Sequence, residues 1–187
     1  MLMKYPNDSS KNYRAKTTYG NRGMSLESDL NDTNNYYNES GIAVIHKKPT
    51  CITIHKVDYL GGRDAIIKEA RFRTPSTTDY NGIYKGKYID FEAKETNNET
   101  SFPLSNIHDH QLEHLRNIIK HGGIGFLIVK FTKLEETYYL SGEHLFDFID
   151  SNKRKSIPYS YFNSVGVLIP TGLRPRLDYL KIIEEII

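Results

Sequence analysis

Three charged residues recur at every second position of one short segment: Asp90, Glu92 and Lys94. This alternation, with apolar residues between them, predicts a β-strand in which the three charged side chains share one face. A carboxylate beside an ammonium group on one strand suits metal-assisted hydrolysis of a phosphodiester. The carboxylate can hold a hard cation through oxygen, and the ammonium can orient an attacking water or offset charge on a pentavalent phosphorus.

A second carboxylate is expected near Glu92, because one carboxylate alone holds Mg²⁺ poorly. Asp79 is the candidate, since it lies thirteen residues before Glu92 and the link contains the turn signals Asn81-Gly82 and Lys85-Gly86. A hairpin there would fold Asp79 back beside Glu92. Thr77 lies two residues before Asp79 and can add an oxygen ligand on the same side. By spacing alone, an exposed strand face with a cross-strand ion pair explains the pattern about as well.

The order Asp79, turn, Glu92-x-Lys94 resembles the signature of the PD-(D/E)xK nucleases. The surrounding segments resemble the RecU family of Holliday junction resolvases, and the resemblance runs from about Tyr5 to the C-terminus. The segments that carry it are Asn21–Met24, Ile45–Thr50, Ser76–Gly86, Tyr88–Thr96 and Thr100–Leu104 through His108–Gln111.

The resemblance implies a Mg²⁺-dependent endonuclease, with Mn²⁺ as a possible substitute, that cuts four-way junction DNA to leave a 5′-phosphate and a 3′-hydroxyl. It implies Thr77, Asp79, Glu92 and Gln111 as metal ligands and Lys94 as the group that stabilises the transition state. Glu27, on a predicted early helix, resembles a glutamate that approaches the metal in related resolvases, although helix-end electrostatics explains it equally well. It further implies a homodimer that acts in homologous recombination and DNA repair with RecA and branch-migration partners. Two symmetric cuts by one site per chain also favour a two-fold dimer.

Composition and charge restrict the class of protein. The chain has 187 residues, one cysteine (Cys51), a net charge of +2 and no apolar run of membrane-spanning length. These features, with no signal-peptide core, predict a cytoplasmic protein without membrane contact. Residues 46–73 hold seven Lys or Arg against three Asp or Glu, which is typical of a surface that faces phosphates, although without the catalytic motif beside it an ordinary solvated patch would explain it better. The predicted DNA-binding residues are Lys47, Lys48, Lys56, Arg63, Arg71 and Arg73.

The elements predicted to position these residues form one α/β domain. A helix capped by Ser25 carries Leu26, Leu30 and Tyr37 at helical spacing. Strands at about 42–45, 88–96, 124–129 and 137–140 predict a mixed central sheet flanked by helices, as in restriction endonucleases. Residues 1–20 are predicted to be a flexible basic arm, residues 21–187 a single nuclease domain, and residues at about 50–68 a protruding β-hairpin stalk.

Two other functions stay open on the sequence. One is a different structure-selective or mismatch-selective endonuclease of the PD-(D/E)xK superfamily. The other is a catalytically idle junction-binding protein, against which the intact set Asp79, Glu92 and Lys94 argues, because binding alone needs no such set.

Overall fold

The computed structural model describes residues 25–61, 64–73 and 77–187. The predicted basic arm, the segment Asn21–Met24 and Arg63 lie outside the described residues. Within the part of the chain that is described, no helix is both long and apolar enough to cross a bilayer.

A six-stranded sheet with the order β1-β4-β5-β7-β8-β10 forms the centre of the body. Strands β5 and β7 are parallel, and the other neighbours are antiparallel, so the sheet is mixed as predicted. Its strands are β1 (Val44–Lys47), β4 (Tyr80–Tyr84), β5 (Lys87–Thr96), β7 (Ile124–Phe131), β8 (Glu136–Ser141) and β10 (Val167–Leu168).

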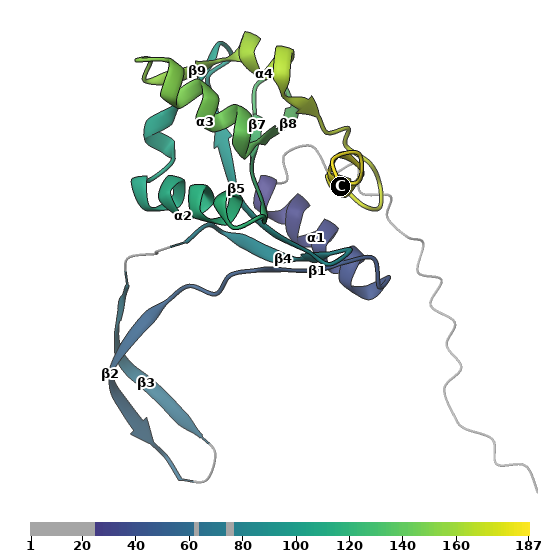
Figure 1. Ribbon diagram of the computed structural model, residues 1–187. Coiled ribbons are helices and arrows are strands. Elements are labelled where there is room, and N and C mark those ends of the chain that lie inside the picture. The colour runs from purple at the N-terminus through teal and green to yellow at the C-terminus, as the bar shows by residue number, and fades with distance from the viewer. Residues whose placement is uncertain (1–24, 62–63, 74–76) are drawn as a thin grey trace, which may run out of the picture.

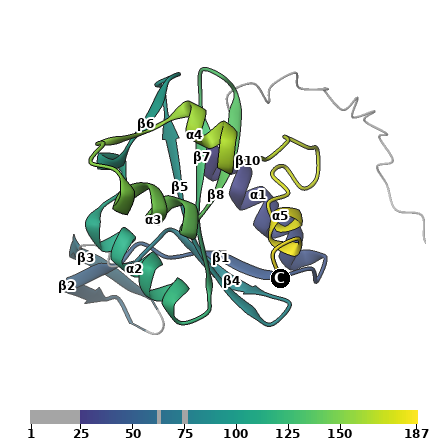
Figure 2. The ribbon, with the colours of Figure 1, turned by 45° about the horizontal axis from the view of Figure 1, so that its top comes forward.

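Helices cover both faces of this sheet (Figures 1 and 2). Each face has its own apolar core. Helices α1 (Leu26–Glu39) and α5 (Leu180–Glu184) cover one face, where Phe91 and Phe126 stack at 4.7 Å. The other face carries α2 (Asp109–Lys120), α3 (Gly142–Ser151) and α4 (Tyr159–Val165). A short turn, η1 (Leu104–Asn106), and a two-stranded sheet, β6 (Ser101–Pro103) with β9 (Ser156–Pro158), complete this side.

The start of α1 confirms the predicted cap. The Ser25 hydroxyl accepts a hydrogen bond from the Ser28 amide at 3.2 Å. A second acceptor comes from the sheet, because Oε1 of Glu95 on β5 accepts the Leu26 amide at 2.5 Å. The first turn of α1 is therefore fixed to the strand that carries the predicted catalytic residues.

The hairpin between β4 and β5 exists, but only one of its two predicted turn signals makes the turn. Lys85 and Gly86 have φ values of 47° and 76°, which close a tight hairpin. Asn81-Gly82 instead lies inside β4, so its prediction as a turn is wrong. A Cβ on Gly82 would lie 2.1 Å from the Val44 carbonyl oxygen, so the glycine is required by the close approach of β1.

A β-hairpin stalk, made of β2 (Ile52–Tyr59) and β3 (Ala65–Phe72), projects from the body as predicted (Figure 1). Its pairing begins at Ile52 opposite Phe72, so the stalk ends four residues later than the predicted limit of about 68. Every residue of β3 is exposed. The stalk therefore presents nearly all of its side chains to solvent.

Candidate active site

Asp79 and Glu92 meet at the start of the β4–β5 hairpin. Tyr80 pairs with Phe91, and the next position outward places Asp79 beside Glu92. The Asp79 amide donates to Glu92 Oε2 at 3.1 Å. The hairpin thus brings the two carboxylates together, as their spacing predicts.

Lys94 lies on the same face of β5, and its ammonium is 2.6 Å from Glu92 Oε1. The Glu92 side chain is fully buried, whereas that of Lys94 keeps 20% of its surface exposed. Apart from this ion pair, Glu92 Oε1 has no hydrogen-bond partner among the described residues. A buried carboxylate oxygen with spare acceptor capacity, beside a second carboxylate, suits a hard divalent cation.

The environment of Glu92 changes its protonation. Burial raises the pKa of the Glu92 carboxyl to about 7, the Lys94 ammonium opposes this rise, and the neighbouring Asp79 carboxylate adds to it. A bound cation would favour the ionised carboxylate in the same way as Lys94 does, with a larger charge.

Glu27, at the start of α1, borders the same hollow as Asp79 and Lys94. The hollow has a volume of about 310 Å³, and its wall is formed by Ser25, Leu26, Glu27, Lys47, Asp79, Tyr80, Ala93, Lys94 and Glu95. The Glu27 carboxylate pairs with Lys47 at 2.5 Å, with both side chains largely exposed. Its catalytic role stays a prediction, and its position at the rim of the hollow is compatible with that role.

The two neutral ligands of the predicted metal site have other contacts. Thr77 Oγ1 donates weakly to the Thr78 carbonyl at 3.4 Å. Gln111 is buried on α2, and its Oε1 accepts the His108 amide at 3.0 Å in the capping box of that helix. An amide oxygen has two lone pairs, so this bond leaves one for a cation.

Carboxylates alone do not complete a metal centre here. Among the described residues, no three His, Cys, Asp or Glu side chains are placed to hold a cation together. A divalent cation bound here would take its remaining ligands from neutral oxygens and water.

Comparison with known proteins gives the family. Residues 21–185 match the family model described as "Recombination protein U" (RecU). The chain belongs to the RecU family. It is 51% identical over 199 residues to a protein of Geobacillus sp. strain WCH70, covering 100% of this chain and 98% of the relative. It is 57% identical over 179 residues to a protein of Listeria welshimeri, covering 94% and 89%. Both relatives are named "Holliday junction resolvase RecU".

The chain is also similar, at a low level, to a solved structure. It is that of Hjc from Archaeoglobus fulgidus, described as a Holliday junction resolvase, with a TM-score of 0.42 and 13% sequence identity. The match covers 75% of this chain and 92% of that one.

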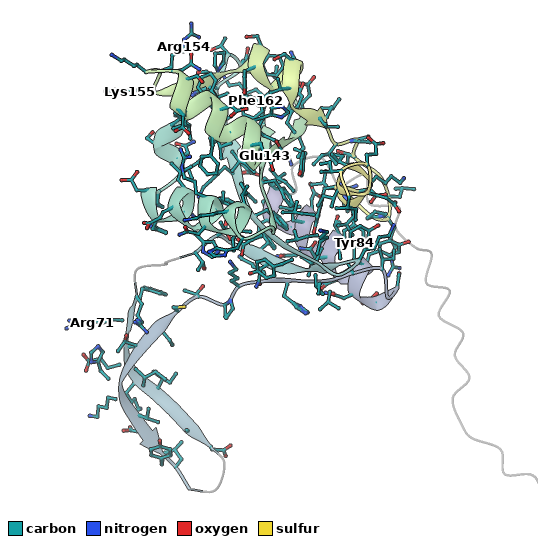
Figure 3. The ribbon with its side chains drawn as sticks, viewed as in Figure 1. Arg71, Tyr84, Glu143, Arg154, Lys155 and Phe162 are labelled. Atoms are coloured by element: carbon teal, nitrogen blue, oxygen red, sulfur yellow. The ribbon has the colours of Figure 1, made fainter. Side chains whose placement is uncertain are left out.

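The basic residues predicted to bind DNA separate into two groups in this RecU-family structure. Lys56, Arg71 and Arg73 are exposed on the stalk or at its end, and Figure 3 shows Arg71 there, outside the body. Lys47 and Lys48 lie at the body instead. The Lys48 ammonium, 18% exposed, is 2.8 Å from the buried Asp90 carboxylate, so it is directed into the protein. Its role as a DNA contact would require it to leave that partner.

Asp90 was missed as a functional candidate. The alternation of β5 already places it on the face of Glu92 and Lys94, but the sequence does not show that it is completely buried. In the structure it accepts hydrogen bonds from Lys48, Thr78 and Tyr88.

Glu92 should make the stability of the metal-free protein depend on pH. Because its folded pKa, about 7, exceeds the ordinary 4.5, its contribution to stability is full below pH 4.5 and is lost as pH rises through 7. The loss should be of the order of 3 kcal/mol. Urea unfolding with a chelator, at about pH 5 and about pH 8, measures it.

A matched variant isolates the contribution of Glu92. Glu92→Gln should be less sensitive to pH across this window than the wild type, whereas Glu113→Gln, at an exposed site of α2, should behave as the wild type. An equal pH dependence in wild type and Glu92→Gln would show that Glu92 ionises normally in the folded protein.

Proposed function

We propose that this protein is a Mg²⁺-dependent endonuclease that resolves Holliday junctions by paired symmetric nicks during homologous recombination and DNA repair. The observation that carries the proposal is the meeting of Asp79, Glu92 and Lys94 at one end of the β4–β5 hairpin. Membership of a family whose relatives are named Holliday junction resolvases supports the choice of substrate.

Asp79 and Glu92 would hold the divalent cation, with Thr77 and Gln111 as additional oxygen ligands. When bound, the cation supplies Lewis-acid chemistry: it polarises the scissile phosphate and lowers the pKa of the attacking water. Mg²⁺ is the proposed ion because all four groups offer oxygen, and Mn²⁺ should substitute because it accepts the same ligands.

Lys94 acts on the charge that develops during cleavage. Its ammonium is already fixed by the Glu92 carboxylate at 2.6 Å, so it needs little reorganisation when the phosphorus becomes pentavalent. The buried position of Glu92 excludes water from one side of this pair and strengthens its field. Cleavage should leave a 5′-phosphate and a 3′-hydroxyl.

The stalk is proposed to contact the junction, because its basic side chains are exposed and lie outside the body. One candidate active site per chain and two cuts per junction favour a two-fold homodimer. We also propose a cytoplasmic location, because the proposed substrate is DNA, and action with RecA and branch-migration partners, which the family resemblance implies. Residues 21–187 are proposed to be one nuclease domain preceded by a basic arm.

The deciding experiment compares a labelled four-way junction with linear duplex of equal length, in Mg²⁺. Paired symmetric nicks in the junction alone are expected. Equal cutting of both substrates, or preferred cutting of a mismatched duplex, would favour another nuclease of the same superfamily. Tight junction binding without cutting in Mg²⁺ or Mn²⁺ would favour a binding protein.

Removal of a basic residue from the stalk should weaken junction binding through phosphate contacts. Lys56→Ala or Arg71→Ala should each lower the slope of log affinity against log salt by about one, because one fewer counterion is released. A salt titration of junction binding measures the slope. Lys181→Ala, at a site that is 79% exposed on the far helix α5, is the matched control. An unchanged slope in the stalk variants would show that the junction binds another part of the protein.

A further inference from the structure

Asp90, on β5, is a fully buried carboxylate with four hydrogen-bonding neighbours, three of them from other segments and one, Tyr88, from β5 itself. Its Oδ1 accepts from the Thr78 hydroxyl. Its Oδ2 accepts from Lys48 Nζ at 2.8 Å and from the Tyr88 hydroxyl at 2.9 Å, and lies 3.1 Å from His114 Nε2. We call Lys48, Thr78, Tyr88, Asp90 and His114 the Asp90 cluster. A buried charge is tolerated when it is satisfied to this extent.

Two members of the Asp90 cluster belong to the segments that attach the stalk to the body. Lys48 follows the last residue of β1 and precedes β2 by four positions. Thr78 lies six positions after the end of β3 and two before β4. The Lys48 ammonium also donates to the Thr78 hydroxyl at 3.0 Å. One carboxylate of the central sheet therefore binds the chain where it leaves for the stalk and where it returns.

The same connection reaches the predicted metal ligand Asp79. The Lys48 amide donates to the Asp79 carbonyl at 2.7 Å, and the Asp79 amide donates to Glu92 Oε2 at 3.1 Å. Asp79 is thus held on one side by the outgoing segment of the stalk and on the other by Glu92. Its chain neighbour Thr78 is fixed by Asp90. A displacement of Lys48 or Thr78 would consequently move the backbone of Asp79.

The cluster does not serve as a cation site itself. Asp90 Oδ2 already has three neighbours within hydrogen-bond distance. The Lys48 ammonium lies where a metal ion would have to bind this carboxylate. Asp90 also contacts neither Asp79 nor Glu92 through any hydrogen bond among the described residues. Asp90 is connected to Asp79 through Lys48, whose amide bonds the Asp79 carbonyl, and through Thr78, the chain neighbour of Asp79.

We propose that Asp90 is a positioning residue, which holds Asp79 against Glu92 by binding both ends of the stalk and so couples the stalk to the metal site. The inference rests on the proposed function, because it takes Asp79 and Glu92 as the metal ligands. It gives Lys48 a different role from the predicted one: its ammonium stabilises the base of the stalk instead of contacting a phosphate.

The test uses three variants, each removing one part of the cluster: Asp90→Asn, Thr78→Val and Lys48→Met. Mn²⁺ binding without DNA, measured by calorimetry, is the first readout, and single-turnover junction cleavage is the second. Each variant should lose about 10-fold to 100-fold in Mn²⁺ affinity or cleavage rate, the usual range for residues that orient metal ligands. Junction affinity in a chelator should change by less than about 3-fold, because no phosphate contact is removed.

Lys48→Met separates the two roles of that lysine. If Lys48 positions Asp79, Mn²⁺ affinity falls and the salt dependence of junction binding stays that of the wild type. If Lys48 contacts a phosphate, the salt slope falls by about one and Mn²⁺ affinity is unchanged. Lys133→Met, at a site that is 61% exposed and paired only with Glu99 among the described residues, is the matched control.

Other outcomes also decide the inference. Wild-type Mn²⁺ affinity and cleavage rate in Thr78→Val and Lys48→Met would overturn it, and these two variants keep the test valid if Asp90→Asn does not fold. A wild-type protein that binds Mn²⁺ but cuts no junction would contradict the proposed function alone, and the Mn²⁺ readout would still decide the role of Asp90.

Discussion

Asp79→Ala should abolish junction cleavage while junction binding persists. Asp79 is one of the two carboxylates proposed to hold the metal ion, and it lies beside the other, Glu92. Loss of a charged ligand should weaken metal binding and reduce the cleavage rate by at least about 10²–10³-fold, the scale for removal of one preorganised electrostatic contact. Single-turnover cleavage in saturating Mg²⁺ measures the rate, and a binding assay in chelator measures junction affinity.

The control for Asp79→Ala is Asp147→Ala, which removes an exposed carboxylate on α3. Its cleavage rate should match the wild type. Because the side chain of Asp79 is only partly buried, Asp79→Ala should fold, and a melting temperature near that of the wild type checks this. A folded Asp79→Ala protein that still cuts junctions at the wild-type rate would move the active site away from this hairpin.

Lys94→Gln should have the second largest effect, and it should act on the rate more than on binding. The variant removes the ammonium that lies 2.6 Å from Glu92 and leaves a neutral polar side chain that is one atom shorter. Without that positive charge, transition-state charge on the phosphate is less stabilised, and the cleavage rate should fall by about 10²-fold or more. Junction affinity should change by less than about 3-fold, because a single charge is lost.

A pH profile gives an independent sign of the Lys94 role. Lys94 lowers the pKa of Glu92 against the effect of burial, so its removal should raise that pKa and move the activity profile toward higher pH. Lys133→Gln, at an exposed lysine, should leave both the rate and the profile unchanged. A Lys94→Gln profile that coincides with the wild type would mean that Lys94 and Glu92 do not interact in the active enzyme.

A small number of hydrogen bonds connects the base of the stalk to the candidate active site, so the position of the stalk affects the site. An isolated two-stranded hairpin is only marginally stable in water, so the orientation of the stalk depends on the segments at its base. Those segments carry Lys48 and Thr78, the two residues that bind Asp90 from either end of the stalk. A junction that engages the stalk would therefore act on the backbone of Asp79 without any contact to the metal site.

Local patterns in the sequence were sufficient for the elements that carry the site. The period of two from Asp90 to Lys94 predicts β5, Ser25 predicts the start of α1, and Lys85-Gly86 predicts the turn that brings Asp79 to Glu92. Each of these depends on residues close in sequence, where backbone geometry follows from side-chain type. Once the turn is placed, the pairing of β4 with β5 is fixed, and this pairing brings Asp79 beside Glu92.

The remaining features depend on contacts between residues far apart in sequence, and only the tertiary structure decided them. Asn81-Gly82 is a dipeptide typical of turns, yet it is part of β4. The glycine is needed there because β1 packs too closely against this position for any side chain. Lys48 is a basic residue of the kind that binds phosphate, but in the structure it is paired with the buried carboxylate of Asp90, 42 residues away. Burial of this kind is set by how the helices and strands pack, which the identity of neighbouring residues does not determine.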